Sequence, residues 1–318
     1  MVRYTHGDPS QVLSEGNRNL WGGPHEQPAY LYAGNVFNGY ELIPWVDRLG
    51  AKLAACLSEL SGLPLFAPLP SGAKGAIILT GDDDQAWLEK YEEQARLIGE
   101  LPITYCMLPH SNHTPETIAE LPRTVEFGVH VDALEHPERY RDVCLRQTEE
   151  VRRLLNNRGA QIIRNHGHLN QDYWGHLSAW EEAGLDFGLN IRGIDGTCIT
   201  GSYLPFRVRR PEGTWSSHTA LLTTFSDTML SLQNWSERKQ ISVIRRLASQ
   251  IERTYPGILV FNFHPQNVSG MAKVHRAVVT LSKRRGWVAL GAESFAAQLA
   301  NRNSVRLSWN GEELTLTS

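Results

Sequence analysis

The sequence has few of the features that mark disulfide-rich, membrane-spanning or nucleic-acid-binding proteins. Only four of its 318 residues are cysteines and none forms a CxxC pair, so we expect buried free thiols rather than disulfides. No apolar run approaches the roughly 20 residues that a membrane helix needs. The start, residues 1–16, is polar and lacks the apolar segment of a signal peptide, which makes the cytoplasm the default location.

An excess of charge of either sign is also missing. The formal net charge is −3, and the 31 basic residues are scattered, so no nucleic-acid surface is indicated. Hydrophobic residues make up 41% and charged residues 20%, as in an ordinary soluble globular protein. The length allows one large α/β domain, alone or with an extension. The oligomeric state cannot be read from the composition.

Short apolar strands alternate with helical patterns from about residue 75 to residue 300. We expect strands at 76–80, 103–108, 125–131, 161–165, 187–191, 258–263 and 287–290, and helices at 40–62, 85–98, 114–121, 138–157, 173–183, 236–253, 270–285 and 294–300. This alternation predicts an α/β fold with a parallel sheet, and about seven such units favour a distorted (β/α)7 TIM-like barrel.

The chain divides into two expected parts. Residues 1–70 do not fit the alternating pattern, and we expect an N-terminal extension or the remnant of a preceding domain. Residues 71–318 would form the barrel, followed by a C-terminal hairpin over 305–317 with its turn at Asn310–Gly311.

Carboxylates and imidazoles follow four of the predicted strands. In parallel α/β folds, reactive residues gather at the carboxyl ends of strands. The residues in these places are Asp82, Asp83 and Asp84, then His130 and Asp132, then Arg164, His166 and His168, and finally His264. The sequence therefore predicts one polar site that draws on distant parts of the chain.

This set of residue types suits a metal-dependent hydrolase. Three adjacent aspartates are costly to bring together unless a cation neutralises them. One carboxylate with two imidazoles is a common ligand set for a divalent metal with open positions, and a second carboxylate could act as a base on water. Taken singly, an aspartate run is usually a solvated turn, and a strand-end histidine is usually structural. Their joint placement favours function.

Four stretches in the same order resemble motifs of the polysaccharide deacetylase family, also called carbohydrate esterase family four. Residues 76–84 resemble its first motif, 125–130 its second, 161–166 its third and 259–265 its fifth, and 277–290 resembles the closing helix and strand. The resemblance covers about residues 75–300. It implies a deacetylase-like catalytic barrel over 71–318 and a divalent metal, with zinc as the first expectation.

The resemblance also implies residue roles. Asp82 would be the catalytic base, and Asp83 a metal ligand, with Asp84 the candidate under an alternative spacing of the motif. His130 would be a second ligand, Arg164 would position the base, and His264 would be the general acid.

Two departures from the family pattern stand out. The second motif usually carries a further histidine four residues on, where this chain has Leu134. His166 is therefore our preferred third ligand, with His136 and His168 in reserve. The fourth motif is also poorly matched, since only Asp195 and residues 203–205 lie in its region.

The expected activity is removal of N-acetyl or related acyl groups from an amino sugar or polysaccharide. One alternative is a metal-dependent amidohydrolase that acts on another C–N bond, and another is a non-catalytic carbohydrate-binding barrel. Four aromatic residues could stack on a sugar ring or belong to the core: Trp87, Tyr173, Trp174 and Tyr203.

Overall fold

The structure, a computed structural model, describes residues 44–317 except for 64, 66, 157, 169–175, 192–197, 199, 211, 233–234 and 310–313. The expectations for Tyr173, Trp174 and Asp195, and most of the proposed extension 1–70, lie outside these residues. The division of the chain at residue 70 stays a prediction.

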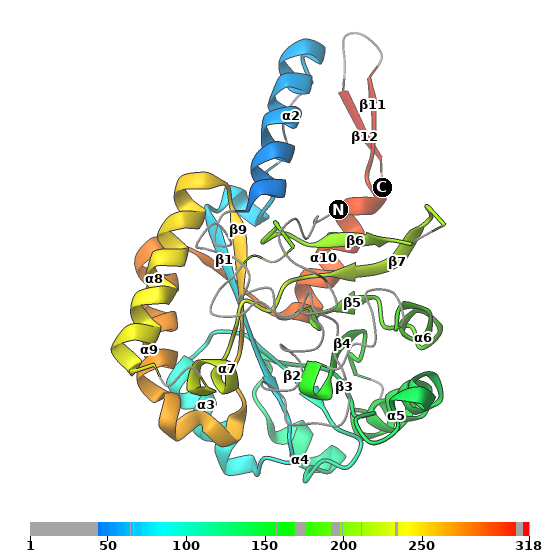
Figure 1. Cartoon of the computed structure of the whole chain (residues 1–318), viewed down its shortest axis with the longest axis vertical. Coiled ribbons are helices and arrows are strands. Elements are labelled where there is room, and N and C mark those ends of the chain that lie inside the picture. Colours follow the sequence, from blue (N-terminus) through cyan, green and yellow to red (C-terminus); the bar gives the residue numbers. More distant parts are fainter. Residues whose placement is uncertain are drawn as a thin grey trace, which may run out of the picture.

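A single curled sheet forms the centre of the molecule (Figure 1). Its order is β6-β7-β5-β4-β3-β2-β1-β9-β8, and β10 pairs with the first part of β1. The strands are β1 (Gly75–Asp82), β2 (Ile103–Met107), β3 (Val125–Val131), β4 (Ile162–Asn165), β5 (Phe187–Gly188), β6 (Phe206–Arg209), β7 (Trp215–Ala220), β8 (Phe225–Ser226), β9 (Gly257–Asn262) and β10 (Val288–Leu290). Among these described strands, every pairing is parallel except that of β6 with β7.

The two edges of the parallel sheet are joined by a short crossing segment. The backbone N–H of Leu221 donates to Gly188 of β5, and the N–H of Thr224, three residues on, donates to Val260 of β9, both at 2.9 Å. The chain thus passes from the β5 edge of the parallel sheet to the β9 edge within the four residues 221–224. The expected distorted (β/α) barrel is confirmed, with an irregular closure in place of a full ladder.

Helices surround the sheet, as Figure 1 shows for α3, α8 and α9 on one side and α5 and α6 on the other. The helices are α2 (Trp45–Ser61), α3 (Leu88–Ile98), α4 (Pro115–Glu120), α5 (Tyr140–Leu154), α6 (Leu177–Glu182), α7 (Asp227–Leu232), α8 (Glu237–Thr254), α9 (Val268–Arg285) and α10 (Ala292–Ser304). Short 3₁₀ turns are η2 (Pro70–Gly72), η3 (Pro137–Arg139), η4 (His166–His168) and η5 (Pro265–Asn267). Thr114 caps α4, since its hydroxyl accepts from the N–H of Thr117.

The two faces of the central strands pack into two separate apolar clusters. On β1, Ala76 and Ile78 belong to one cluster, while Ile77 and Leu79 belong to the other, which also contains residues of α3, α8 and α9. This alternation follows from the two-residue period of a strand. It decides which side chains at the strand ends face the interior of the barrel.

The differences from the expected elements lie mainly between residues 192 and 235. No strand or helix was expected in that stretch, but it contains the antiparallel pair β6 and β7, the two-residue strand β8 and the helix α7. These elements are short, and the buried positions of β7 include the polar residues Ser216 and His218, so the sequence lacks the apolar–polar alternation that marks a half-buried strand. The expected C-terminal hairpin is confirmed as β11 (Arg306–Trp309) paired with β12 (Leu314–Thr317); its turn lies outside the described residues.

Two smaller expectations can be compared with the structure. All four cysteines are free, but Cys56 is exposed, so the expectation of burial is wrong for that thiol. In the part of the chain that the structure describes, no helix combines the length and the apolarity that crossing a bilayer requires.

Candidate active site

The three aspartates that follow β1 point to different places. Asp82 continues the face of Ile78 and Thr80, toward the barrel interior, whereas Asp83 lies on the opposite face because side chains alternate along a strand. The chain then turns sharply: Asp84 has φ +37° and Gln85 has φ +60°, the left-handed region that side chains rarely adopt. This turn brings the carboxylate of Asp84 back to the site.

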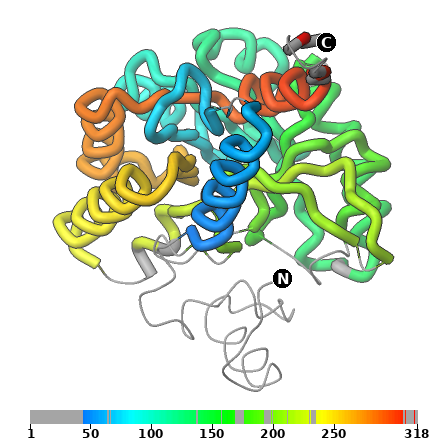
Figure 2. The backbone as a smooth tube through the Cα atoms, turned by 90° about the horizontal axis from the view of Figure 1, so that it is seen from above, coloured from blue at the N-terminus to red at the C-terminus, as the bar shows by residue number. Residues whose placement is uncertain are grey.

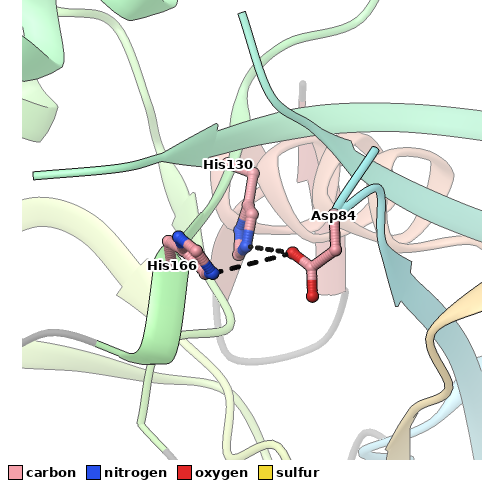
Figure 3. A group of neighbouring side chains, drawn as sticks. All are labelled: Asp84, His130 and His166. Atoms are coloured by element: carbon pink, nitrogen blue, oxygen red, sulfur yellow. Dashed lines mark ion pairs between the residues drawn. The ribbon is translucent and has the colours of Figure 1, made fainter. Parts of the chain in front are cut away.

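Asp84, His130 and His166 form a group at the ends of β1, β3 and β4 (Figure 3). Oδ1 of Asp84 lies 3.4 Å from Nε2 of His130 and 3.9 Å from Nε2 of His166. One ligand atom from each residue lies within 4.8 Å of the other two. The preferred third ligand, His166, is thus the histidine that the fold brings to His130.

The imidazole rings of His130 and His166 are each held in their orientation by a contact of Nδ1. Nδ1 of His130 lies 2.9 Å from the carbonyl oxygen of Arg164, and Nδ1 of His166 lies 3.0 Å from Oδ2 of Asp132. Each ring therefore has its Nε2 left for the site. Nε2 of His130 and Oδ1 of Asp84 are buried and have no hydrogen-bond partner in the described structure. Two such atoms facing each other fit a divalent cation, which would satisfy both.

Charges around the group favour the ionised carboxylate. Burial opposes ionisation of Asp84, but His130 and His264 outweigh it and hold the pKa of Asp84 below its ordinary value. Burial likewise opposes protonation of His166, but Asp132 outweighs it and raises the pKa of His166. A metal ion would compete with that proton.

Asp83 occupies a separate environment behind the strand. Its Oδ1 accepts a hydrogen bond from the hydroxyl of Tyr91 at 2.7 Å and lies 3.9 Å from Nε2 of His113. Burial raises the pKa of Asp83. The geometry therefore separates Asp83 from His130 and His166, contrary to its expected place among the ligands, and brings Asp84 to them.

The two histidines held in reserve also lie apart from the group. His136 is largely exposed, and its Nδ1 lies 3.5 Å from Glu138. His168 is buried, with Nδ1 at 2.9 Å from the carbonyl oxygen of Asn190.

Asp82 is held by a buried arginine. Nη1 of Arg164 donates to Oδ1 of Asp82 at 2.8 Å, and Nδ2 of Asn262 donates to Oδ2 at 2.8 Å. Nη2 of Arg164 donates to Oγ1 of Thr80, also at 2.8 Å, which fixes the guanidinium. Burial alone would raise the pKa of Asp82, but Arg164, His130 and His264 together hold it well below its ordinary value. The carboxylate is therefore ionised and oriented.

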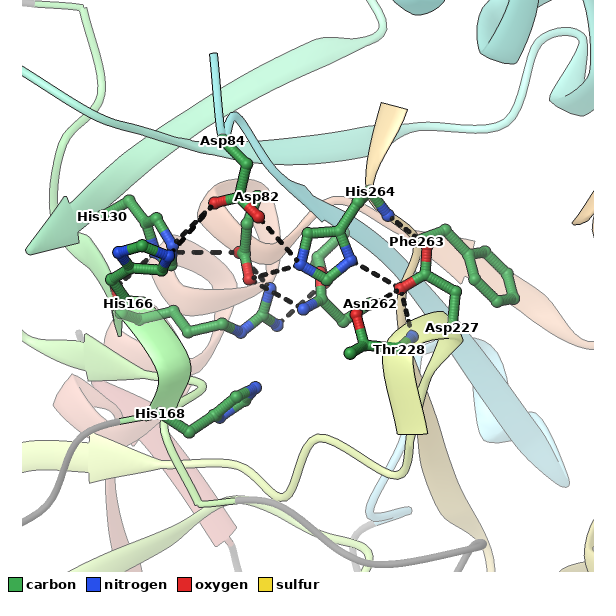
Figure 4. A network of polar contacts seen from close by, with 12 residues as sticks. Asp82, Asp84, His130, His166, His168, Asp227, Thr228, Asn262, Phe263 and His264 are labelled. Atoms are coloured by element: carbon green, nitrogen blue, oxygen red, sulfur yellow. Dashed lines mark hydrogen bonds and ion pairs between the residues drawn. The ribbon is translucent and has the colours of Figure 1, made fainter. Parts of the chain in front are cut away.

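His264 faces the aspartates from the other side of the site (Figure 4). Its Nε2 lies 3.5 Å from Oδ2 of Asp82 and 3.5 Å from Oδ2 of Asp84. Its Nδ1 lies 2.5 Å from Oδ1 of Asp227, whose Oδ2 accepts from the backbone N–H of His264 at 2.9 Å. Burial opposes protonation, but Asp227 and Asp82 outweigh it and raise the pKa of His264 well above its ordinary value.

Sequence reasoning missed Asp227. It opens α7 directly after the two-residue strand β8, in a stretch where no strand or helix was expected. The one available signal was that Asp227 follows the partly apolar segment 221–225. This segment is too short to identify the end of a strand.

The two described aromatic candidates differ in position. Tyr203 is fully buried, and its carbonyl oxygen accepts from the N–H of Ile258 near the start of β9, away from the strand ends that form the site. Trp87 is 66% exposed and lies three residues after Asp84. Of these two described residues, Trp87 is the one that a ligand could contact.

Comparison with known proteins gives matches among solved structures, whereas no family model and no curated protein matches the chain. A probable polysaccharide deacetylase from Pseudomonas aeruginosa PAO1 has a TM-score of 0.53 and 14% identity, over 78% of this chain and 98% of that chain. A protein of Mycobacterium smegmatis assigned as a polysaccharide deacetylase has a TM-score of 0.52 and 15% identity, over 79% and 99%. The Puue allantoinase has a TM-score of 0.52 and 13% identity, over 77% and 95%. The chain therefore has the fold of these proteins, as the motif resemblance implies.

Proposed function

We propose that this protein is a metal-dependent hydrolase of C–N bonds that removes N-acetyl groups from an amino sugar or polysaccharide. One observation carries the proposal: Asp82 and His264 flank the group Asp84, His130 and His166, whose ligand atoms converge. A base, an acid and a ligand set for a cation are the parts that amide hydrolysis needs.

Asp84, His130 and His166 would hold the metal, for which zinc is the first candidate because it favours nitrogen and carboxylate ligands with an open position. When bound, such an ion would polarise the acyl oxygen and lower the pKa of a water molecule. Asp132 and the carbonyl oxygen of Arg164 orient the two imidazoles for this task.

Asp82 would act as the base. A water molecule adds to the acyl carbon and loses a proton to the Asp82 carboxylate, so a C–O bond forms. Arg164 and Asn262 keep the carboxylate in place, each with one hydrogen bond at 2.8 Å. Arg164, His130 and His264 lower the pKa of this carboxylate and make it a weak base in the free enzyme, so Asp82 would depend on a water molecule of lowered pKa.

His264 would act as the acid. Nε2 of His264 gives its proton to the nitrogen of the leaving amine as the C–N bond breaks, which leaves acetate and a free amine. Asp227 holds Nδ1 and keeps the ring protonated and oriented.

The substrate class is supported by the fold that the chain shares with the two bacterial proteins described as polysaccharide deacetylases. A second candidate, hydrolysis of a cyclic amide, is favoured by the equally similar fold of the allantoinase. Either reaction would draw on the same base and acid, because in both a water molecule cleaves an amide C–N bond.

Product release from a small substrate panel tests the proposal. N-acetylated amino-sugar oligomers, an N-formyl sugar and allantoin are each incubated with the protein, with chelator, and with chelator followed by Zn²⁺. We expect acetate from the sugars, its loss with chelator and its return with metal. Cleavage of allantoin alone would favour the second candidate. Sugar binding with neither hydrolysis nor a bound metal ion would reduce the protein to a binding module.

A comparison of two substrates tests whether His264 acts as the acid. His264→Ala should lower turnover on the amide far more than on an aryl acetate ester, whose leaving group needs no proton. Equal losses on both would argue that His264 only shapes the site, and loss of the metal would make it a ligand. His136→Ala is the matched control, because that exposed histidine lies outside the site.

A further inference from the structure

Helix α2 carries a stripe of large apolar side chains that nothing in the described chain covers. Trp45, Leu49, Leu53, Leu57 and Leu60 are between 52% and 86% exposed. Exposed apolar stripes of this length mark interaction surfaces. Figure 1 shows α2 projecting beyond the barrel, and Figure 2 shows it from above as the blue helix at that end.

The helix presents its faces in an unusual way. One side bears Asp47, which contacts Ser202 and Tyr203 of the body, and the small, half-buried residues Ala51, Ala54 and Ser58. The large apolar residues lie on the opposite side. A helix that packed only on its own domain would show the reverse arrangement, with its apolar face inward.

The exposed residues follow the seven-residue spacing of helices that pair with other helices. Val46, Leu49, Leu53, Cys56 and Leu60 are separated by three, four, three and four residues. Alternate steps of three and four keep one seam along the helix, as in coiled coils. All five residues of this α2 seam are exposed.

We propose that a second copy of this chain covers the α2 seam, with the two α2 helices packed antiparallel about a two-fold axis. When the axis passes between residues 54 and 55, Leu49 lies opposite Leu60 of the second copy, and Leu53 lies opposite its Cys56. The symmetry repeats both contacts, as an isologous interface requires.

Charge complementarity selects this partner and this direction. Lys52 and Glu59 lie on the same flank of the α2 seam. In the antiparallel pair Lys52 faces Glu59 of the second copy, and the symmetry makes a second such pair. In a parallel pair Lys52 would instead face Leu57, so no ion pair would form.

A glycine on the other flank agrees with the same arrangement. Gly50 lies inside the helix, where glycine costs about 0.5–1 kcal/mol relative to alanine, and no described atom lies within 4 Å of where its side chain would begin. Nothing described in this chain requires a glycine there. In the antiparallel pair, Leu57 of the second copy lies opposite Gly50 and would fill that space.

The position of α2 leaves the candidate active site open. The carboxylate of Asp47 accepts from the N–H of Tyr203 at 2.8 Å, and the carbonyl oxygen of Tyr203 accepts from Ile258 near the start of β9. The candidate site lies at the opposite end of that strand. The inference is therefore independent of the proposed function.

Molar mass measured against concentration tests the proposal on the full chain. Light scattering after size exclusion, with sedimentation equilibrium, should show a dimer of twice the 35.7 kDa chain mass. Leu53→Lys should weaken association at least about tenfold. Ala55→Lys, which adds the same charge on an exposed position outside the seam, should leave the dimer intact. A wild-type monomer at all concentrations, or a dimer that tolerates Leu53→Lys, overturns the proposal.

Charge reversal tests the direction. Lys52→Glu and Glu59→Lys should each weaken the dimer about tenfold or more at low salt, because each places like charges together twice. The double variant Lys52→Glu/Glu59→Lys should restore it, since both ion pairs reform with reversed sign. A double variant as weak as either single variant overturns the antiparallel arrangement.

Discussion

The carboxylate of Asp82 is buried, and Arg164, His130 and His264 hold its pKa well below the ordinary value, while Arg164 and Asn262 each give it a hydrogen bond. Asp82→Asn keeps the size of the side chain and an oxygen for Arg164 but removes the group that accepts a proton. We expect turnover to fall by about two to four orders of magnitude. Metal content, measured by elemental analysis, should stay near that of the wild type. Full activity in this variant would exclude Asp82 as the base.

The neighbouring residues Asp83 and Asp84 provide a matched pair of variants. Asp84→Asn should lose most of the metal, since Asp84 alone of the two faces His130 and His166. Asp83→Asn should retain it, because that side chain contacts Tyr91 behind the strand. Metal content after dialysis against a weak chelator measures both. Retention by Asp84→Asn with loss by Asp83→Asn would return the ligand role to Asp83.

Asp227 gives a prediction about pH. It raises the pKa of His264, and His264 must be protonated to act as an acid, so activity is lost as the pH rises through that pKa. Asp227→Asn removes the negative charge and lowers the pKa of His264. The alkaline limb of the kcat profile on an amide should therefore move to lower pH. An unchanged alkaline limb would show that another group controls it.

At the scale of the elements, the pattern of apolar residues predicted most of the fold but less of the site. The strand β3 has the predicted bounds, Val125–Val131, because an apolar residue stands at every second position of this segment, which is the two-residue period of a strand. The placement of Asp84 was harder, since it depends on two successive positive φ angles without a glycine to mark the turn. Asp227 follows a strand of only two residues, where no periodic signal exists.

The end of β9 is held by a buried side chain of α3 that the sequence did not single out. Nε2 of Gln94 donates to the carbonyl oxygen of Phe263 at 2.9 Å and lies 3.0 Å from Nε2 of His275. Oε1 of Gln94 accepts from the hydroxyl of Tyr105 at 2.8 Å. Since the carbonyl of Phe263 belongs to the peptide bond that leads into His264, Gln94 positions the proposed acid.

Gln94→Met tests this positioning role. The variant leaves buried polar groups unpaired, which should lower the free energy of unfolding by about 1–3 kcal/mol. It should also reduce kcat on an amide more than on an aryl ester. Tyr105→Phe is the control: it removes a hydrogen bond to Gln94 but leaves the one to Phe263, so the amide-to-ester ratio should stay near that of the wild type. A common ratio in both variants would leave Gln94 with a structural role alone.

At the scale of the whole molecule, the candidate metal would join the ends of β1, β3 and β4, which lie far apart in the sequence. A ligand that binds the folded state alone stabilises it in proportion to the logarithm of its concentration. We therefore expect Zn²⁺ to raise the Tm of the wild type, as measured by calorimetry. His166→Ala should lose this increase, whereas His136→Ala should keep it.

The pH dependence of that increase identifies the group that competes with the metal. Asp132 raises the pKa of His166 in the metal-free protein. Protonation of His166 favours the metal-free fold at low pH, and that contribution is lost as the pH rises through the raised pKa. The metal binds the neutral imidazole, so its stabilising effect should have the opposite dependence and disappear as the pH falls through the same range.

Asp132→Asn separates this proton competition from simple orientation of the ring. Removing the carboxylate lowers the pKa of His166, so the pH below which the apparent Kd for Zn²⁺ begins to rise should move to lower pH. Loss of the hydrogen-bond partner also weakens binding by about 10–100-fold, which raises the apparent Kd at every pH but does not move this bend. The bend, measured by titrating Zn²⁺ at a series of pH values from 8 downward, is therefore the decisive quantity. A bend that stays in place would assign the competing proton to a residue other than His166.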